Sequence, residues 1–415
     1  MKLHAIRFDF PRPTDELRLC VIVPAKDEEH TLDNTLRALY HQVDQQGTPI
    51  SKRWYEIIVF ANNCTDNTAG IARQFAANHP DVALHIIEHQ LLAPQAHVGY
   101  VRRVLMDEAY RRLCTLGSLR GVIASTDGDT TVSPTWIHYT LQAIEQGADV
   151  VGGRIIAEPQ QAGRRYYLQD VSYRYLQAQI ESIIDPDPVD PWPRHFQNFG
   201  PSLAVTAELY ARAGRLPVLP SLEDVRFYEA LQRCDARIRH CPQVQVSTSA
   251  RTRGRVAFGF SVQLQQWQEM LQTGIPFTVP PADYWIARFT LQRQVRCAWQ
   301  RMSFSLLQFT ARSLMLSPYE LYDRMSQTPC FGEFWQWLIA MPHVEALLAE
   351  RFPRVDIAVA IADLRHYSQR IRPFVPKRQA GTVRYAVGSG VLAHENVGPS
   401  GETLRVLRRR SGGNS

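Results

Sequence analysis

The chain has 415 residues, of which 45% are hydrophobic and 21% are charged, values typical of a globular protein. This length exceeds what one compact core usually holds, so we expect two domains. Seven scattered cysteines without a secretory signal argue against a disulfide framework and favour the cytoplasm. No apolar stretch approaches the ~20 residues that a membrane span needs.

The net charge of +6 is concentrated in arginine-rich segments, one at residues 251–255 and one at residues 408–410. Such clusters suit phosphates, anionic lipid surfaces or nucleic acid, although a solvated basic face explains the second segment better. We expect no nucleic acid partner, and peripheral contact with a membrane stays open.

Residues 19–23 form a continuous apolar run of strand type, which Pro24 and Ala25 end. Residues 26–29, Lys-Asp-Glu-Glu, then open a predicted helix with leucines at positions 32, 36 and 39 on its apolar face. Acids in the first turn of a helix interact favourably with its dipole, which explains Glu28 and its acidic neighbours without any catalytic role.

The next segment repeats this strand-to-helix pattern. Residues 55–60 predict a strand, residues 61–68 a polar turn, residues 71–77 a helix and residues 82–87 a third strand. Strands that alternate with helices favour a parallel sheet with right-handed crossovers, so we expect an α/β fold.

The tripeptide Asp127-Gly128-Asp129 follows a further apolar run at residues 121–126. Two acids at the end of a central strand lie where open α/β sheets bind ligands. Their oxygen atoms suit Mg²⁺ or Mn²⁺ held against a phosphate group. The competing interpretation is a solvated turn, because Asp and Gly are ordinary turn residues.

Together with this tripeptide, three other motifs make the chain resemble the family 2 glycosyltransferases of the GT-A fold. Residues 23–29 read Val-Pro-Ala-Lys-Asp-Glu-Glu, residues 62–68 read Asn-Asn-Cys-Thr-Asp-Asn-Thr, and residues 222–224 read Leu-Glu-Asp. The match covers roughly residues 17–255. It implies a Rossmann-like, mostly parallel central sheet and metal-dependent transfer of a hexose from a nucleotide sugar.

The resemblance also implies roles for the residues at the matching positions. The donor nucleotide would contact Pro24, Ala25, Glu28, Asn62, Asp66, Arg102, Asp127 and Gly128. The metal, Mg²⁺ or Mn²⁺, would bind Asp129 and Asp127, with His240 as a further ligand as in some relatives. The base that deprotonates the acceptor hydroxyl would be Asp224, with Glu223 beside it, which implies inversion at the anomeric carbon.

The second turn departs from the family pattern, because Ala61 and Asn62 stand where an acidic pair is usual. An Asn both donates and accepts hydrogen bonds, whereas a carboxylate only accepts, so the nucleobase need not be uracil. Simple turn propensity explains Asn62 and Asn63 equally well.

Other candidates also have structural alternatives. Arg102 suits the diphosphate best, whereas Arg103 has Asp107 as an ion-pair partner four residues on. Ser221 and Asp224 have the spacing of a capping box, which would make the acid structural. A lone histidine such as His240 is more often an ordinary surface or core residue.

From about residue 283 the chain is predicted to be helical and rich in aromatic residues. These helices form either an appended domain or a homodimer surface. We expect a catalytic domain at 1–265, divided into a nucleotide-sugar half at 17–155 and an acceptor half at 156–265, then a helical domain at 266–375 and a flexible tail at 376–415.

We therefore predict a cytoplasmic glycosyltransferase that moves a sugar from a UDP- or GDP-sugar to an unidentified acceptor hydroxyl. One alternative is a sugar-nucleotide pyrophosphorylase-like nucleotidyltransferase, but those enzymes carry a Gly-rich loop after the first strand and residues 24–27 are not one. The other alternative is a non-catalytic basic surface-binding protein, which would not need an acidic tripeptide at the end of a strand.

Overall fold

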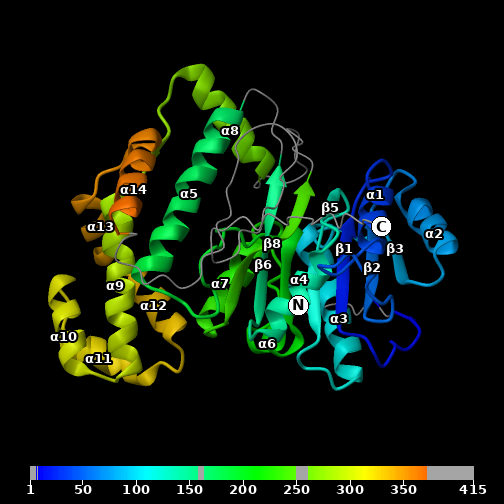
Figure 1. The fold of residues 1–415 in the computed structure, drawn as a ribbon, viewed down its shortest axis with the longest axis horizontal. Helices are drawn as coiled ribbons and strands as arrows, with labels where there is room; N and C mark the ends of the chain where they lie inside the picture. Colours follow the sequence, from blue (N-terminus) through cyan, green and yellow to red (C-terminus); the bar gives the residue numbers. More distant parts are fainter. Residues whose placement is uncertain (1–5, 7, 158–162, 249–259, 372–415) are drawn as a thin grey trace, which may run out of the picture.

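The computed structural model describes residues 6, 8–157, 163–248 and 260–371 (Figure 1). The predicted tail and both arginine-rich segments lie outside these residues. One large sheet occupies the centre, and a group of long helices stands against one end of it (Figure 1).

The large sheet has eight strands in the order β3-β2-β1-β4-β7-β6-β8-β5. The first four are parallel, β6 and β8 are parallel, and the pairs β4–β7, β6–β7 and β5–β8 are antiparallel. Their bounds are β1 Leu19–Ala25, β2 Tyr55–Asn62, β3 Ala83–His89, β4 Val122–Ser125, β5 Thr130–Val132, β6 Val150–Ala157, β7 Leu203–Thr206 and β8 Ile238–Thr248. This sheet confirms the mostly parallel GT-A architecture predicted from the sequence.

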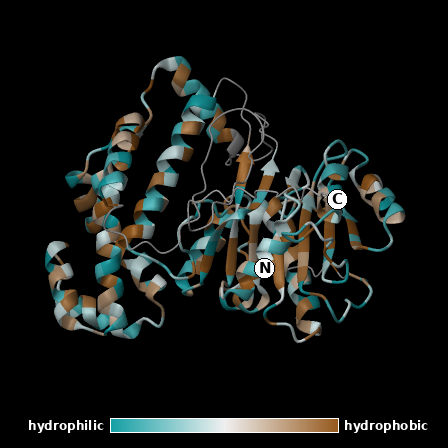
Figure 2. Ribbon diagram, viewed as in Figure 1, coloured by the Kyte–Doolittle hydropathy of each residue, from teal (hydrophilic) through white to brown (hydrophobic). Residues whose placement is uncertain are grey.

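Helices cover both faces of the sheet. Each strand presents side chains to both sides, and every residue of β1 and β2 is buried. One apolar core contains Val21 and Leu36, and the other contains Ile22 and Leu105. The covering helices are α1 Leu32–Tyr40, α2 Thr68–Asn78, α3 Val98–Thr115, α4 Trp136–Glu145, α6 Ala207–Arg212 and α7 Glu223–Arg233. The apolar strands appear as a brown block in Figure 2.

The first helix begins later than predicted. Residues 26–29 were expected to open it, but α1 starts at Leu32. The reason is local, because Asp27 has a left-handed backbone with φ of 49°, which a helix cannot accommodate. The acids at positions 27–29 therefore do not serve the dipole of α1, and their side chains are available to the neighbouring turn.

The remaining helices gather at one end of the sheet, and α5 is the longest of them (Figure 1). Their bounds are α5 Arg164–Ile184, α8 Phe260–Thr273, α9 Ala282–Gln300, α10 Phe304–Ser313, α11 Pro318–Gln327, α12 Phe331–Ile339, α13 Pro342–Arg351 and α14 Ile357–Ile371. A short antiparallel pair joins β9 Thr278–Val279 to β10 Val355–Asp356. Within the described ranges, no helix is long and apolar enough to cross a membrane.

Candidate active site

Three of the predicted motifs meet at the carboxyl ends of β1, β2 and β4. The Gly128 N–H donates to Pro24 O over 3.2 Å. A Cβ added at Gly128 would lie 3.1 Å from the Ala25 Cβ and 3.3 Å from the Glu28 Cγ, closer than most Cβ contacts, so glycine suits this close approach. The acidic tripeptide and the turn after β1 are therefore packed directly against each other.

The turns after β1 and β2 are tied together by acidic side chains. The Asp27 Oδ1 accepts from the Thr65 N–H over 2.7 Å, and the Asp66 Oδ2 accepts from the Glu29 N–H over 3.0 Å. The Glu28 N–H donates to the Thr68 hydroxyl over 2.7 Å. Asp66 and Glu28 thus shape the two turns, and any contact that they make with a nucleotide comes in addition to this structural role.

Buried polar atoms without partners cluster at these strand ends. Asn62 closes β2 and is only 6% exposed, yet its Oδ1 has no hydrogen-bond partner within the described part of the chain. The same holds for the Ser125 Oγ and the Thr126 Oγ1 at the end of β4, and for the Arg102 Nε. Because an unpaired buried polar atom costs about 1–3 kcal/mol, such a group is expected where a ligand supplies the missing partner.

Arg102 of α3 joins the acidic tripeptide to the Glu-Asp motif. Its Nη2 donates to the Asp127 Oδ1 over 2.7 Å, and its Nη1 donates to the Glu223 Oε1. The Arg102 side chain is 6% exposed and that of Glu223 is 4% exposed. A Cβ at Gly200 would lie 2.7 Å from the Arg102 Nη1, so glycine is needed for the guanidinium to fit.

The charges in this cluster shift one another. Burial alone would lower the pKa of Arg102, but Asp127 and Glu223 raise it above its ordinary value. Burial raises the pKa of Asp127 to about 6, and the neighbouring Asp129 adds to that rise while Arg102 opposes it. The site therefore holds more negative charge than its single buried arginine balances, which suits a divalent cation.

Asp224 lies in the first turn of α7, and the capping box proposed for it is not formed. The helix is preceded by Leu222 with φ of 58° and has no side-chain cap. The Asp224 Oδ2 instead accepts from the Gly200 N–H over 2.8 Å, and its Oδ1 accepts from the Val225 N–H over 2.8 Å. Asp224 is half-buried, whereas Glu223 is enclosed with Arg102, so Asp224 is the more accessible acid of the two.

Arg103 has the structural role that was left open for it. It donates to the Asp107 Oδ2 over 2.7 Å and to the Leu216 O over 2.7 Å. Gly99, one turn earlier, allows the chain before α7 to approach, because a Cβ there would lie 2.0 Å from the Leu219 O. Arg102 and Arg103 therefore face different surroundings although they are adjacent in sequence.

The expectation that His240 completes the metal shell is corrected by its contacts. Its Nδ1 donates to the Asp190 Oδ2 over 2.7 Å, and its Nε2 lies 3.1 Å from the Tyr228 hydroxyl. His240 pairs with Gly152 on β6, whereas Thr130, the residue after Asp129, pairs with Thr248 at the other end of β8. Both ring nitrogens already have protein partners, so we do not keep His240 as a metal ligand.

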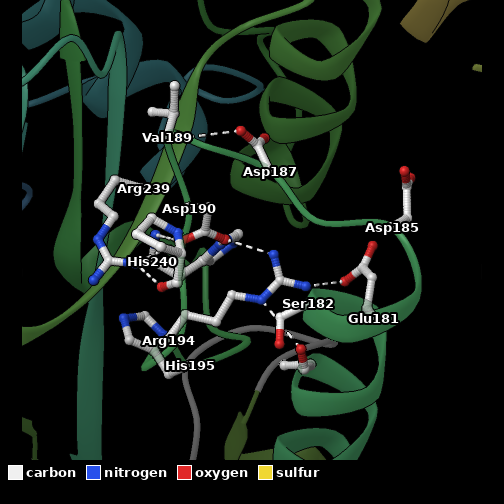
Figure 3. Close-up of polar contacts among 12 residues, drawn as sticks. Glu181, Ser182, Asp185, Asp187, Val189, Asp190, Arg194, His195, Arg239 and His240 are labelled. Atoms are coloured by element: carbon white, nitrogen blue, oxygen red, sulfur yellow. Dashed lines mark hydrogen bonds and ion pairs between the residues drawn. The ribbon is translucent and has the colours of Figure 1, made fainter. Parts of the chain in front are cut away.

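The sequence analysis missed the buried cluster around Asp190, which Figure 3 shows between α5 and β8. Asp190 lies in the proline-rich loop at residues 185–193, which gives no helix or strand signal. The one available signal was the pair Asp190 and Arg194, which are four residues apart and form an ion pair of 2.9 Å.

The first part of the chain matches the model of a known protein family. Residues 17–185 match the family described as Glycosyltransferase like family 2. These residues are similar to glycosyltransferase family 2, over less than half of the chain. The family 2 segment contains the first three motifs and Arg102, and the Glu-Asp motif lies beyond it. No curated protein matches the chain.

Three solved structures are similar to the chain at low identity. S. aureus TarS 1-349 in complex with UDP has 16% identity and a TM-score of 0.43, over 87% of this chain and 93% of the TarS 1-349 chain. The mannosyltransferase PcManGT from Pyrobaculum calidifontis, in complex with GDP-Man and Mn²⁺, has 15% identity and a TM-score of 0.38, over 88% and 91%. Glucosyl-3-phosphoglycerate synthase from Mycobacterium tuberculosis, in complex with Mg²⁺ and UDP, has 16% identity and a TM-score of 0.35, over 64% and 84%.

Proposed function

We propose that this chain transfers a sugar from a metal-bound nucleotide sugar to an acceptor hydroxyl, with inversion at the anomeric carbon. The observation that carries the proposal is the contact of Arg102 with both Asp127 and Glu223. It joins the acidic tripeptide of the family 2 segment to the helix that bears Asp224. A donor-binding motif and a candidate base therefore share one site.

The residues of the acidic tripeptide fit a divalent cation. Asp129 and Asp127 offer carboxylate oxygens, which Mg²⁺ and Mn²⁺ prefer, and Gly128 holds the turn against the β1 motif. When bound, the metal would neutralise charge on the departing diphosphate. Arg102 donates a hydrogen bond to one oxygen of Asp127 and would supply a positive charge beside the diphosphate.

The nucleoside part of the donor is assigned to the ends of β1 and β2. Pro24 and Ala25 would border the base and ribose, together with the turn that Asp66 shapes. The unpaired Asn62 Oδ1 is a buried acceptor, so it suits an N–H group on the base. Uracil and guanine both present a ring N–H, so this contact fits either a UDP-sugar or a GDP-sugar.

Asp224 is assigned the base. Its carboxylate would take the proton of the acceptor hydroxyl while the acceptor oxygen forms a bond to the anomeric carbon. The bond from that carbon to the diphosphate oxygen breaks in the same step, so the configuration inverts. Glu223 is enclosed with Arg102 and serves to hold that arginine.

The test compares Asp224→Asn with Asp235→Asn as a matched control. Asp235 also accepts from two backbone N–H groups, those of Phe331 and Gly332, but it caps α12 away from the site. Loss of the base should lower turnover by about 10²–10⁴, whereas loss of the Asp235 contacts should lower stability alone.

Nucleotide binding measured by calorimetry should persist in both variants, because neither removes a donor or metal contact. Turnover within threefold of wild type in Asp224→Asn would contradict the assignment of the base. Retained configuration in the product, read from the anomeric proton by NMR, would exclude direct displacement even if turnover collapsed.

A further inference from the structure

A chain of buried hydrogen bonds reaches Tyr228 on α7, the helix that carries the proposed base. It has no part in the reaction described above. It centres on Asp190, which is 3% exposed and sits in the loop between α5 and β7 (Figure 3). The Asp190 carboxylate accepts from the Arg194 Nη1 over 2.9 Å, from the Arg239 Nη1 over 3.1 Å and from the His240 Nδ1 over 2.7 Å. Burial opposes the negative charge, but His240 and Arg194 lower the pKa of Asp190 below its ordinary value.

The hydrogen bonds of this chain have a defined direction. An ionised carboxylate only accepts hydrogen bonds. The His240 Nδ1 therefore carries a hydrogen and donates the hydrogen bond to Asp190. When the ring is neutral, the Nε2 is an acceptor, and the Tyr228 hydroxyl 3.1 Å away donates to it. Burial raises the pKa of Tyr228, so the phenol keeps its proton.

His195 closes the other side of the His240 ring. Its ring centroid lies 5.7 Å from that of His240, with the planes at 84°. Its Nδ1 accepts from the Gln197 N–H over 3.0 Å, and its Nε2 lies 3.1 Å from the Gly152 O and donates to it. Burial lowers the pKa of His195 well below its ordinary value, so its ring stays neutral and packs His240 in place.

The two ends of the chain lie on different helices. Arg194 donates to the Glu181 Oε2 of α5 over 2.7 Å, as Figure 3 shows, so Asp190 is fixed to that helix. Tyr228 belongs to α7 and lies one helical turn after Asp224, on the same face. The hydrogen bonds therefore run from α5 through β8 to the helix that carries the proposed base.

We propose that the Asp190–His240–Tyr228 chain positions α7, so that Tyr228 and His240 are positioning residues for Asp224. This inference rests on the proposed function. The start of α7 has no side-chain cap. Two hydrogen bonds hold its first turn: Arg102 donates to the Glu223 carboxylate, and the Gly200 N–H donates to the Asp224 carboxylate. The bond from Tyr228 to His240 fixes the second turn of the helix and with it the direction of the Asp224 carboxylate.

The first variant is Tyr228→Phe, which removes one hydroxyl and keeps the ring. Misplacement of a reacting group by about 1 Å can cost 10²-fold in rate, so we expect kcat to fall by about 10–100-fold. The Kd of the nucleoside diphosphate with Mn²⁺ should stay within twofold, because the donor contacts lie elsewhere. The matched control is Tyr210→Phe on α6, which also removes one tyrosine hydroxyl and its hydrogen bond, here of 2.8 Å to the Asp107 carboxylate.

The second variant is His240→Asn, whose amide can still donate to Asp190 while losing the bond to Tyr228. If the two residues act as one chain, Tyr228→Phe and His240→Asn should have similar effects on kcat, and the double variant should be no slower than the worse single one. Additive losses in the double variant would contradict a shared chain.

The outcomes separate this inference from the proposed function. Turnover of Tyr228→Phe equal to that of Tyr210→Phe, with Asp224→Asn inactive, overturns the positioning role and leaves the base assigned. Normal turnover in Asp224→Asn overturns the proposed function, and the positioning role falls with it. A lower kcat in Tyr228→Phe, normal kcat in Tyr210→Phe and unchanged nucleotide binding in both support the inference.

Discussion

Replacing Arg102 by methionine is the sharpest test of how the site is held together. The substitution leaves the Glu223 carboxylate, 4% exposed, and the adjacent Asp127 without their shared cation. Breaking a buried ion pair by removing one partner costs about 3–5 kcal/mol, because the remaining charge is uncompensated. For a chain of this size we expect the Tm to fall by roughly 3–6 °C.

The control for this variant is Arg103→Met, which breaks the ion pair with Asp107 and the bond to the Leu216 O. Both variants should lower the Tm in thermal denaturation, but only Arg102→Met should weaken Mn²⁺-dependent binding of a nucleoside diphosphate. Adding Glu223→Gln to Arg102→Met should recover most of the lost stability, since removing both partners of a pair costs far less than removing one. A wild-type Tm for Arg102→Met, or no recovery in the double variant, would refute the reasoning.

Two further predictions concern the metal and the pH dependence of stability. Asp129→Asn should keep the fold and lose Mn²⁺-dependent nucleotide binding, and unchanged affinity by calorimetry would exclude Asp129 as a ligand. On the sheet, burial would raise the pKa of Glu56, but His85 and Arg112 lower it from 4.5 to about 2. A lowered pKa stabilises the fold above pH 4.5, and this contribution of about 3 kcal/mol should disappear as the pH falls toward 2. Urea unfolding from pH 7 to pH 2 should therefore show a shallower decline in Glu56→Gln than in wild type, and equal slopes would contradict this assignment.

The nucleotide half of the fold could be predicted because its signals are local. Apolar runs at residues 19–23, 55–60 and 82–87 lie within the observed β1, β2 and β3 or overlap them. The turns that follow such strands meet at one sheet edge by the geometry of parallel strands, so the proximity of the acidic tripeptide to the β1 turn was also predictable.

The part of the fold after residue 155 could not be predicted to the same depth, because its contacts join residues far apart in sequence. Nothing near Arg102 indicates that Glu223, 121 positions later, shares its guanidinium. Asp190 lies 50 positions before His240, in a loop whose prolines indicate only an irregular backbone. The start of α1 was misplaced for a different reason, since the left-handed Asp27 is set by its contact with Thr65 of the neighbouring turn.

The acceptor side depends on the C-terminal helices through α5. Tyr173 and Ile180 of α5 share an apolar core with Phe289 of α9 and with α14. The Ser368 hydroxyl of α14 donates to the Gln179 Oε1 over 2.9 Å, within the same stretch of α5. Since the next turn of α5 holds Arg194 and thereby Asp190, the helices that pack on α5 also support the hydrogen-bond chain behind the proposed base. We infer that the C-terminal helices contribute to the geometry around the proposed base.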